Sequence, residues 1–131
     1  MNNEAQYFLR TANDSLNSLH KKFDIKNEIE HRQLLILCTD CVELALKALL
    51  FQYGWPIDDI KKAIKHDLLL TFQFISAPDQ IVISVAKFDN DNWSWIRRYP
   101  ETCYSALTTE LFPEDPIPVT QEIINWVNTE F

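Results

Sequence analysis

The stretch Leu34–Tyr53, LLILCTDCVELALKALLFQY, decides the fold that the sequence predicts. It contains no glycine or proline and is rich in leucine and alanine, which are strong helix formers. Gly54 follows directly and Pro56 comes soon after. A glycine in the left-handed conformation followed by a proline is the usual end of a helix. We therefore predict one long helix over residues 30–53.

Apolar residues cover a wide arc of this predicted helix. An arc of this width is typical of a helix that is surrounded by others, because a surface helix keeps one broad polar face. We therefore expect this helix to lie in the middle of a bundle. The residues of the arc are Leu34, Leu35, Leu37, Cys38, Cys41, Val42, Ala45, Ala48 and Leu49.

Apolar periodicity predicts a helix at each end of the chain. Residues 3–23 repeat apolar side chains at steps of three and four. The last residues do the same after Thr120, which is a candidate N-cap for a helix over residues 120–131. The preceding stretch EDPIPV, residues 114–119, is expected to form a rigid turn.

Between these ends the sequence predicts three shorter helices. The first covers residues 56–65, and the second covers residues 68–75 with Asp67 as its N-cap. Residues 78–88 are β-branched and could form a strand by propensity, but no partner strand is visible elsewhere, so we predict a helix. Residues 1–131 are therefore expected to form one all-α domain, an up-and-down bundle of about five helices.

The composition of the chain bounds its function. The sequence has 131 residues with a formal net charge of −7, which argues against a general nucleic-acid binder, because such proteins neutralise many phosphates with lysine and arginine. The one glycine, Gly54, leaves no Gly-rich phosphate loop. No apolar run is long enough to cross a bilayer, and the N-terminus MNNEAQYFLR lacks the pattern of a signal peptide. We expect a cytoplasmic protein without a membrane partner.

The cysteines and histidines suggest no metal or cofactor site. Cys38 and Cys41 form a CxxC pattern whose helical spacing puts both sulfurs on one face, but no second ligand pair accompanies them. They also lie far from a helix N-terminus, so we predict small core residues. His20 and His31 are expected at the surface, whereas His66 is distinguished by the aspartate and the leucine run that follow it.

Asp40, Glu43 and Lys47 form a polar stripe on the long apolar helix. Glu43 and Lys47 are four residues apart in the favourable order for an ion pair. One interpretation is a solvated stripe. The other is a polar site in a cleft between helices, facing Arg97 or Arg98.

The segment Trp93–Pro100, WSWIRRYP, places two arginines behind two tryptophans. It could form a surface turn in which Arg97 and Arg98 pair with nearby carboxylates. It could equally form an anion or nucleotide site, because a guanidinium group binds phosphate through two hydrogen bonds, and Tyr99 or a tryptophan could stack on a base.

Three stretches taken together resemble the HEPN (higher eukaryotes and prokaryotes nucleotide-binding) domain. They are TDCVELALKALLFQYGWP, KHDLLLTFQFI and RRYPE, and the resemblance covers about residues 5–130. Members of this family show Glu-x-x-x-Lys-Ala on the second helix, here Glu43–Ala48, and His-Asp-Leu at the start of the third, here His66–Leu68. One branch carries Arg-Tyr-Pro after the fourth helix, here Arg98–Pro100.

The resemblance implies a helical bundle that is usually a homodimer. Many members are encoded beside minimal nucleotidyltransferases in toxin–antitoxin or defence gene pairs. Their best-understood activity is metal-independent RNA cleavage, which depends on an arginine followed four to six residues later by a histidine. This chain has no histidine after Arg98, and Cys103 and Tyr104 stand near the expected position. Without help, neither titrates near neutral pH as a general base should.

Three hypotheses for the function follow. The first is a non-catalytic module that binds a nucleotide or a nucleotidyltransferase-like partner in a cleft lined by Arg98, Tyr99, Glu43, Lys47 and His66. The second is a divergent ribonuclease in which Arg97 or Arg98 stabilises the pentavalent phosphate and His66 acts as the base. The third is a pure interaction protein, in which the Arg-Tyr-Pro turn only shapes a dimer interface.

Overall fold

Every regular element in the described part of the chain is a helix. The computed structural model describes residues 3–19, 23–63, 68–89 and 112–131. The prediction of an all-α fold is confirmed for these ranges. The elements are α1 (Asn3–Asn17), α2 (Glu28–Gln52), α3 (Ile57–Ala63), the 3-10 helix η1 (Leu68–Gln73), α4 (Asp79–Phe88) and α7 (Pro116–Thr129).

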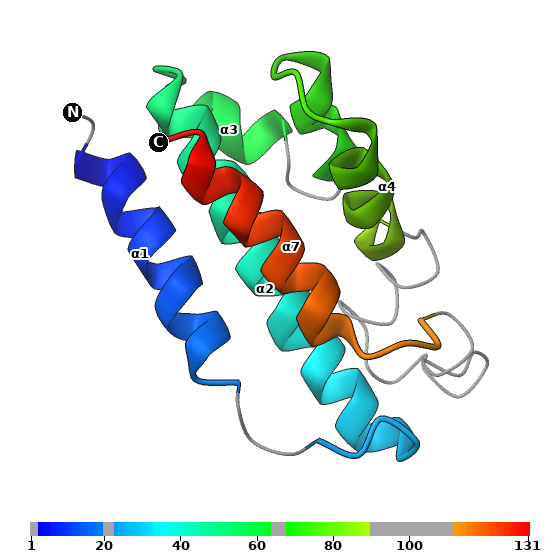
Figure 1. The fold of residues 1–131 in the computed structure, drawn as a ribbon. Coiled ribbons are helices and arrows are strands. Elements are labelled where there is room, and N and C mark those ends of the chain that lie inside the picture. The colour runs from blue at the N-terminus through cyan, green and yellow to red at the C-terminus, as the bar shows by residue number, and fades with distance from the viewer. Residues whose placement is uncertain (1–2, 20–22, 64–67, 90–111) are drawn as a thin grey trace.

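The long helix α2 lies at the centre of the arrangement (Figure 1). α1 packs along α2 in the antiparallel direction, α7 packs on α2 in the parallel direction, and α4 flanks α7 on its other side. α1 and α7 also touch, because the side-chain amides of Asn13 and Asn128 exchange two hydrogen bonds of 3.1 Å each. The helix that the sequence predicts for the middle of the bundle is therefore the central one.

Both ends of α2 are fixed by local interactions. Asn27 is the N-cap, and its Oδ1 accepts hydrogen bonds from the backbone N–H groups of Ile29 and Glu30 at 3.0 and 3.2 Å. At the other end Gly54 has a φ of 87°. The N–H of Gly54 bonds to the carbonyl of Phe51, and the N–H of Trp55 to that of Leu50, which is the Schellman pattern. The predicted end of this helix is confirmed.

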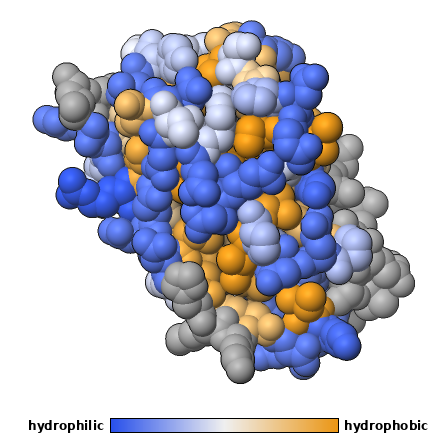
Figure 2. All heavy atoms as spheres, viewed as in Figure 1, coloured by the Kyte–Doolittle hydropathy of each residue, from blue (hydrophilic) through white to orange (hydrophobic). Residues whose placement is uncertain are grey.

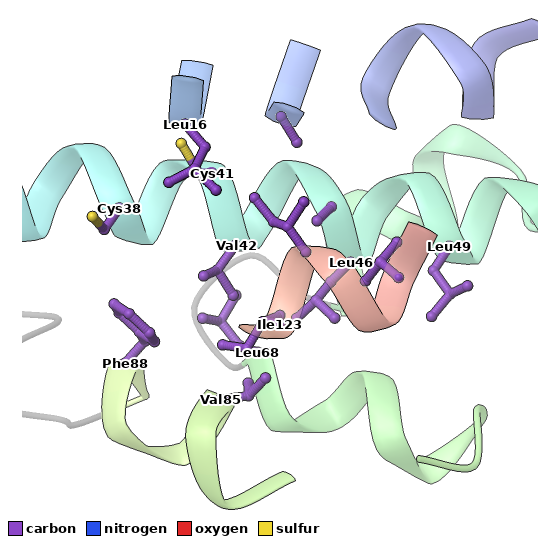
Figure 3. Close-up of a cluster of buried hydrophobic side chains, with 14 of the residues drawn as sticks. Leu16, Cys38, Cys41, Val42, Leu46, Leu49, Leu68, Val85, Phe88 and Ile123 are labelled. Carbon is purple, nitrogen blue, oxygen red and sulfur yellow. The ribbon is translucent and has the colours of Figure 1, made fainter. Parts of the chain in front are cut away.

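The core is built around α2, and its sides face different neighbours. In Figure 3, Cys41 lies beside Leu16 of α1, whereas Val42 and Leu46 are directed toward Ile123 of α7. All five of these side chains are buried. The two-sided burial explains the wide apolar arc in the sequence, because each side of α2 needs its own apolar stripe.

The surface between the helices is partly apolar. In Figure 2, polar residues cover the outward surfaces of α1 and α7, while apolar residues reach the surface in the strip between these two helices. The polar outer faces agree with the amphipathic periodicity of both segments.

α1 is shorter than the sequence predicts, because it ends at Asn17 and not at residue 23. The hydroxyl of Ser18 donates to the carbonyl of Ser15 at 2.7 Å, which gives the backbone an alternative to a further helical turn. Leu19 is nevertheless buried, and Phe23 packs against the core. The apolar periodicity therefore continues beyond the helix.

α7 begins at Pro116, four residues before the predicted start at Thr120. Its N-cap is Asp115, whose Oδ1 accepts from the N–H of Ile117 at 3.0 Å. The stretch EDPIPV therefore opens the helix and is not a turn that precedes it. Prolines are tolerated in a first helical turn, because the N–H groups there have no intrahelical acceptor. Thr120 is buried inside the helix, and its hydroxyl donates to the carbonyl of Pro116 at 2.7 Å.

The described elements between α3 and α7 are η1 and α4, and each starts within one residue of its predicted start. Residues 68–73 form a 3-10 helix, where the sequence predicts an ordinary helix over 68–75. Asp67, its predicted N-cap, lies outside the described residues, and the N–H of Leu69 donates to Oδ2 of Asp89 at 3.0 Å. α4 is helical as predicted, because Ile81, Val85 and Phe88 are buried at helical spacing.

Candidate functional site

Two of the six predicted site residues lie in the described part of the chain. Glu43 and Lys47 stand on α2, and the distance from Nζ of Lys47 to Oε2 of Glu43 is 3.9 Å. Arg97, Arg98, Tyr99 and His66 lie outside the described residues. Whether these four join Glu43 and Lys47 in one cleft stays a prediction.

The polar stripe on α2 is neither buried nor fully solvated. The side chains of Glu43 and Lys47 are 20% and 25% exposed, and Asp40, one turn earlier, is exposed. Pairs at this spacing contribute about 0.3–0.5 kcal/mol to helix stability when they are exposed, and the 3.9 Å separation here gives no reason to expect more. The stripe is thus accessible to a partner, and its role in folding is small.

Next to this stripe, the surface between α1 and α2 is hollowed. One hollow of about 310 Å³ is lined by residues of both helices. A second, of about 330 Å³, adjoins it at Leu37, which lines both, and lies between α2 and Phe23, beyond the end of α1. We call the two hollows together the α1–α2 groove. Its lining residues are Ser15, Ser18, Leu19, Phe23, Gln33, Ile36, Leu37, Asp40, Cys41 and Leu44.

The groove lies on the side of α2 that faces away from α7. Leu44 is two residues from Leu46, which is directed toward Ile123 of α7 in Figure 3, and two residues of a helix differ by about 200° in direction. Leu37 is 41% exposed although it belongs to the predicted apolar arc. The apolar arc of α2 therefore extends beyond the face that packs in the core, and Leu37 reaches the surface.

Both cysteines of the CxxC pattern are buried thiols whose pKa values are raised. Burial raises the pKa of Cys38 from 9.0 to about 12 and that of Cys41 to about 11. The charge of Asp40 also raises the pKa of Cys41. Both thiols are therefore protonated near neutral pH, and a protonated thiol is a poor nucleophile.

The prediction of small buried residues at these positions is confirmed, since both cysteines are free and belong to the core. Their neighbours differ, however. Cys41 lies beside Leu16 of α1 in Figure 3, whereas Cys38 interacts with Thr120 of α7. The predicted single face is thus divided between two helices, because positions three apart on a helix differ by about 60° in direction.

His31 is buried, and the prediction of a surface histidine is wrong. It is 1% exposed, and its Nε2 lies 2.6 Å from the backbone carbonyl of Phe112. A carbonyl oxygen can only accept, so Nε2 carries the proton. Nδ1 of His31 has no hydrogen-bond partner among the described residues. The position of His31 in the sequence, three residues before Leu34, continues the apolar arc of α2 and could have indicated its burial.

The end of α4 and the residues just before α7, which flank residues 90–111, contact each other near His31. The rings of Phe88 and Phe112 lie 5.0 Å apart, and Nζ of Lys87 lies 2.8 Å from Oε1 of Glu114. Both phenylalanines are buried. The two positions that border the predicted Arg97–Tyr99 site are therefore side by side at the beginning of α2.

The described ranges hold no cluster of three or more histidine, cysteine, aspartate or glutamate side chains suited to a metal ion. No helix in these ranges combines the length and hydropathy needed to cross a bilayer. Comparisons with protein-family models, with curated proteins and with solved structures found no match.

Proposed function

We propose that this chain is a HEPN-like, non-catalytic module that binds a protein partner in the α1–α2 groove. The motifs Glu43–Ala48, His66–Leu68 and Arg98–Pro100 support the HEPN-like assignment through their order and spacing. The resemblance makes the proposed partner a nucleotidyltransferase-like protein of a toxin–antitoxin or defence pair.

The observation that carries this proposal is the chemistry of the groove. Among its described lining residues, Asp40 and Cys41 alone carry titratable side chains, and the Cys41 thiol is protonated near neutral pH. The described lining contains no histidine, lysine or arginine to transfer a proton or to stabilise a phosphate. An apolar surface with one carboxylate suits a protein better than a nucleotide, because the carboxylate repels phosphate groups.

The proposal excludes ribonuclease activity and predicts a specific complex. Excess protein should leave a short structured RNA intact in the presence of a chelator, and cleavage by wild type and not by Arg98→Ala would establish the ribonuclease alternative. The protein encoded next to this chain should copurify with wild type and with Ile83→Ser. It should not copurify with Leu37→Ser.

Ile83 is the matched control because it is a similarly apolar side chain, 55% exposed, on α4. Equal copurification with Leu37→Ser and with wild type would place the partner elsewhere and refute the role of the groove. Far-UV circular dichroism should show that both variants keep the helical content of wild type, since both replaced side chains are exposed.

A further inference from the structure

We draw no further inference here: the strongest candidate, the aromatic surface beyond the end of α2 where the exposed ring of Phe74 lies 4.4 Å from that of Trp55, is an apolar face for which nothing in the described part of the chain shows what covers it.

Discussion

Raising the pH should destabilise the wild-type chain more than a variant in which Cys38 and Cys41 are both alanine. The pKa values of the two thiols rise from 9.0 to about 12 and about 11 in the folded state because both side chains are buried. In the unfolded chain each thiol releases its proton near pH 9. Above that pH the unfolded state binds fewer protons than the folded state, so the free energy of unfolding must fall as the pH rises.

The size of the effect follows from the same values. At about pH 10, ionisation lowers the free energy of the unfolded chain by about 1.4 kcal/mol for each thiol, while both folded thiols stay largely protonated. The pair therefore contributes about 2–3 kcal/mol between neutral pH and pH 10. Solvent does not screen these two thiols in the folded chain, because Cys38 is 0% and Cys41 2% exposed.

Urea titrations in the presence of a reductant, followed by far-UV circular dichroism, measure this difference. Wild type and Cys38→Ala/Cys41→Ala are compared from about pH 7 to about pH 10. Lysines, tyrosines and Cys103 are common to both proteins, so their titration cancels in the comparison. The double variant is expected to be less stable at neutral pH because of the lost volume, but its pH dependence should be flatter. Parallel curves would refute the burial of the two thiols.

Two further predictions concern the ends of α2. Gly54→Ala should lower the free energy of unfolding by about 1–2 kcal/mol, because the backbone at a φ of 87° is strained for an L-residue while a Cβ there meets nothing within 4 Å. Urea denaturation measures it, and a loss as large with Gly54→Asn would contradict the explanation, since asparagine tolerates this conformation. Asn27→Ala should cost about 1 kcal/mol through the loss of the two capping bonds, whereas Asn27→Asp should retain the stability of wild type in a thermal melt. Equal melting temperatures for the alanine and aspartate variants would show that this cap contributes nothing.

The parts of the fold that local chemistry determines could be predicted from the sequence. The end of α2 needed only Gly54 and Pro56, and α4 needed only its apolar period. The end of α1 could not be predicted from periodicity, because Leu19 and Phe23 still contact the core after the helix has ended. At the start of α7 the sequence predicts Thr120 as the cap and a turn at the preceding prolines, whereas Asp115 is the cap and the prolines fit the first helical turn.

The candidate site was predictable to a smaller extent. The spacing of Glu43 and Lys47 was sufficient to predict their pairing on one helix. The burial of His31 depends on the carbonyl of Phe112, which is 81 residues away in the sequence and has no local signature. The hollows beside α2 depend on how α2 packs against α1 and the residues that follow it. The apolar periodicity of the sequence does not specify this packing.

The contact between Phe88 and Phe112 has a consequence for how this bundle could vary. The helices on either side already meet through two aromatic rings and the pair Lys87–Glu114. The chain between them therefore starts and finishes at neighbouring points, and doubling its length would cost only about 0.6 kcal/mol in closure entropy. At this junction one connecting segment could be exchanged for another, by design or in evolution, while the surrounding helices keep their packing.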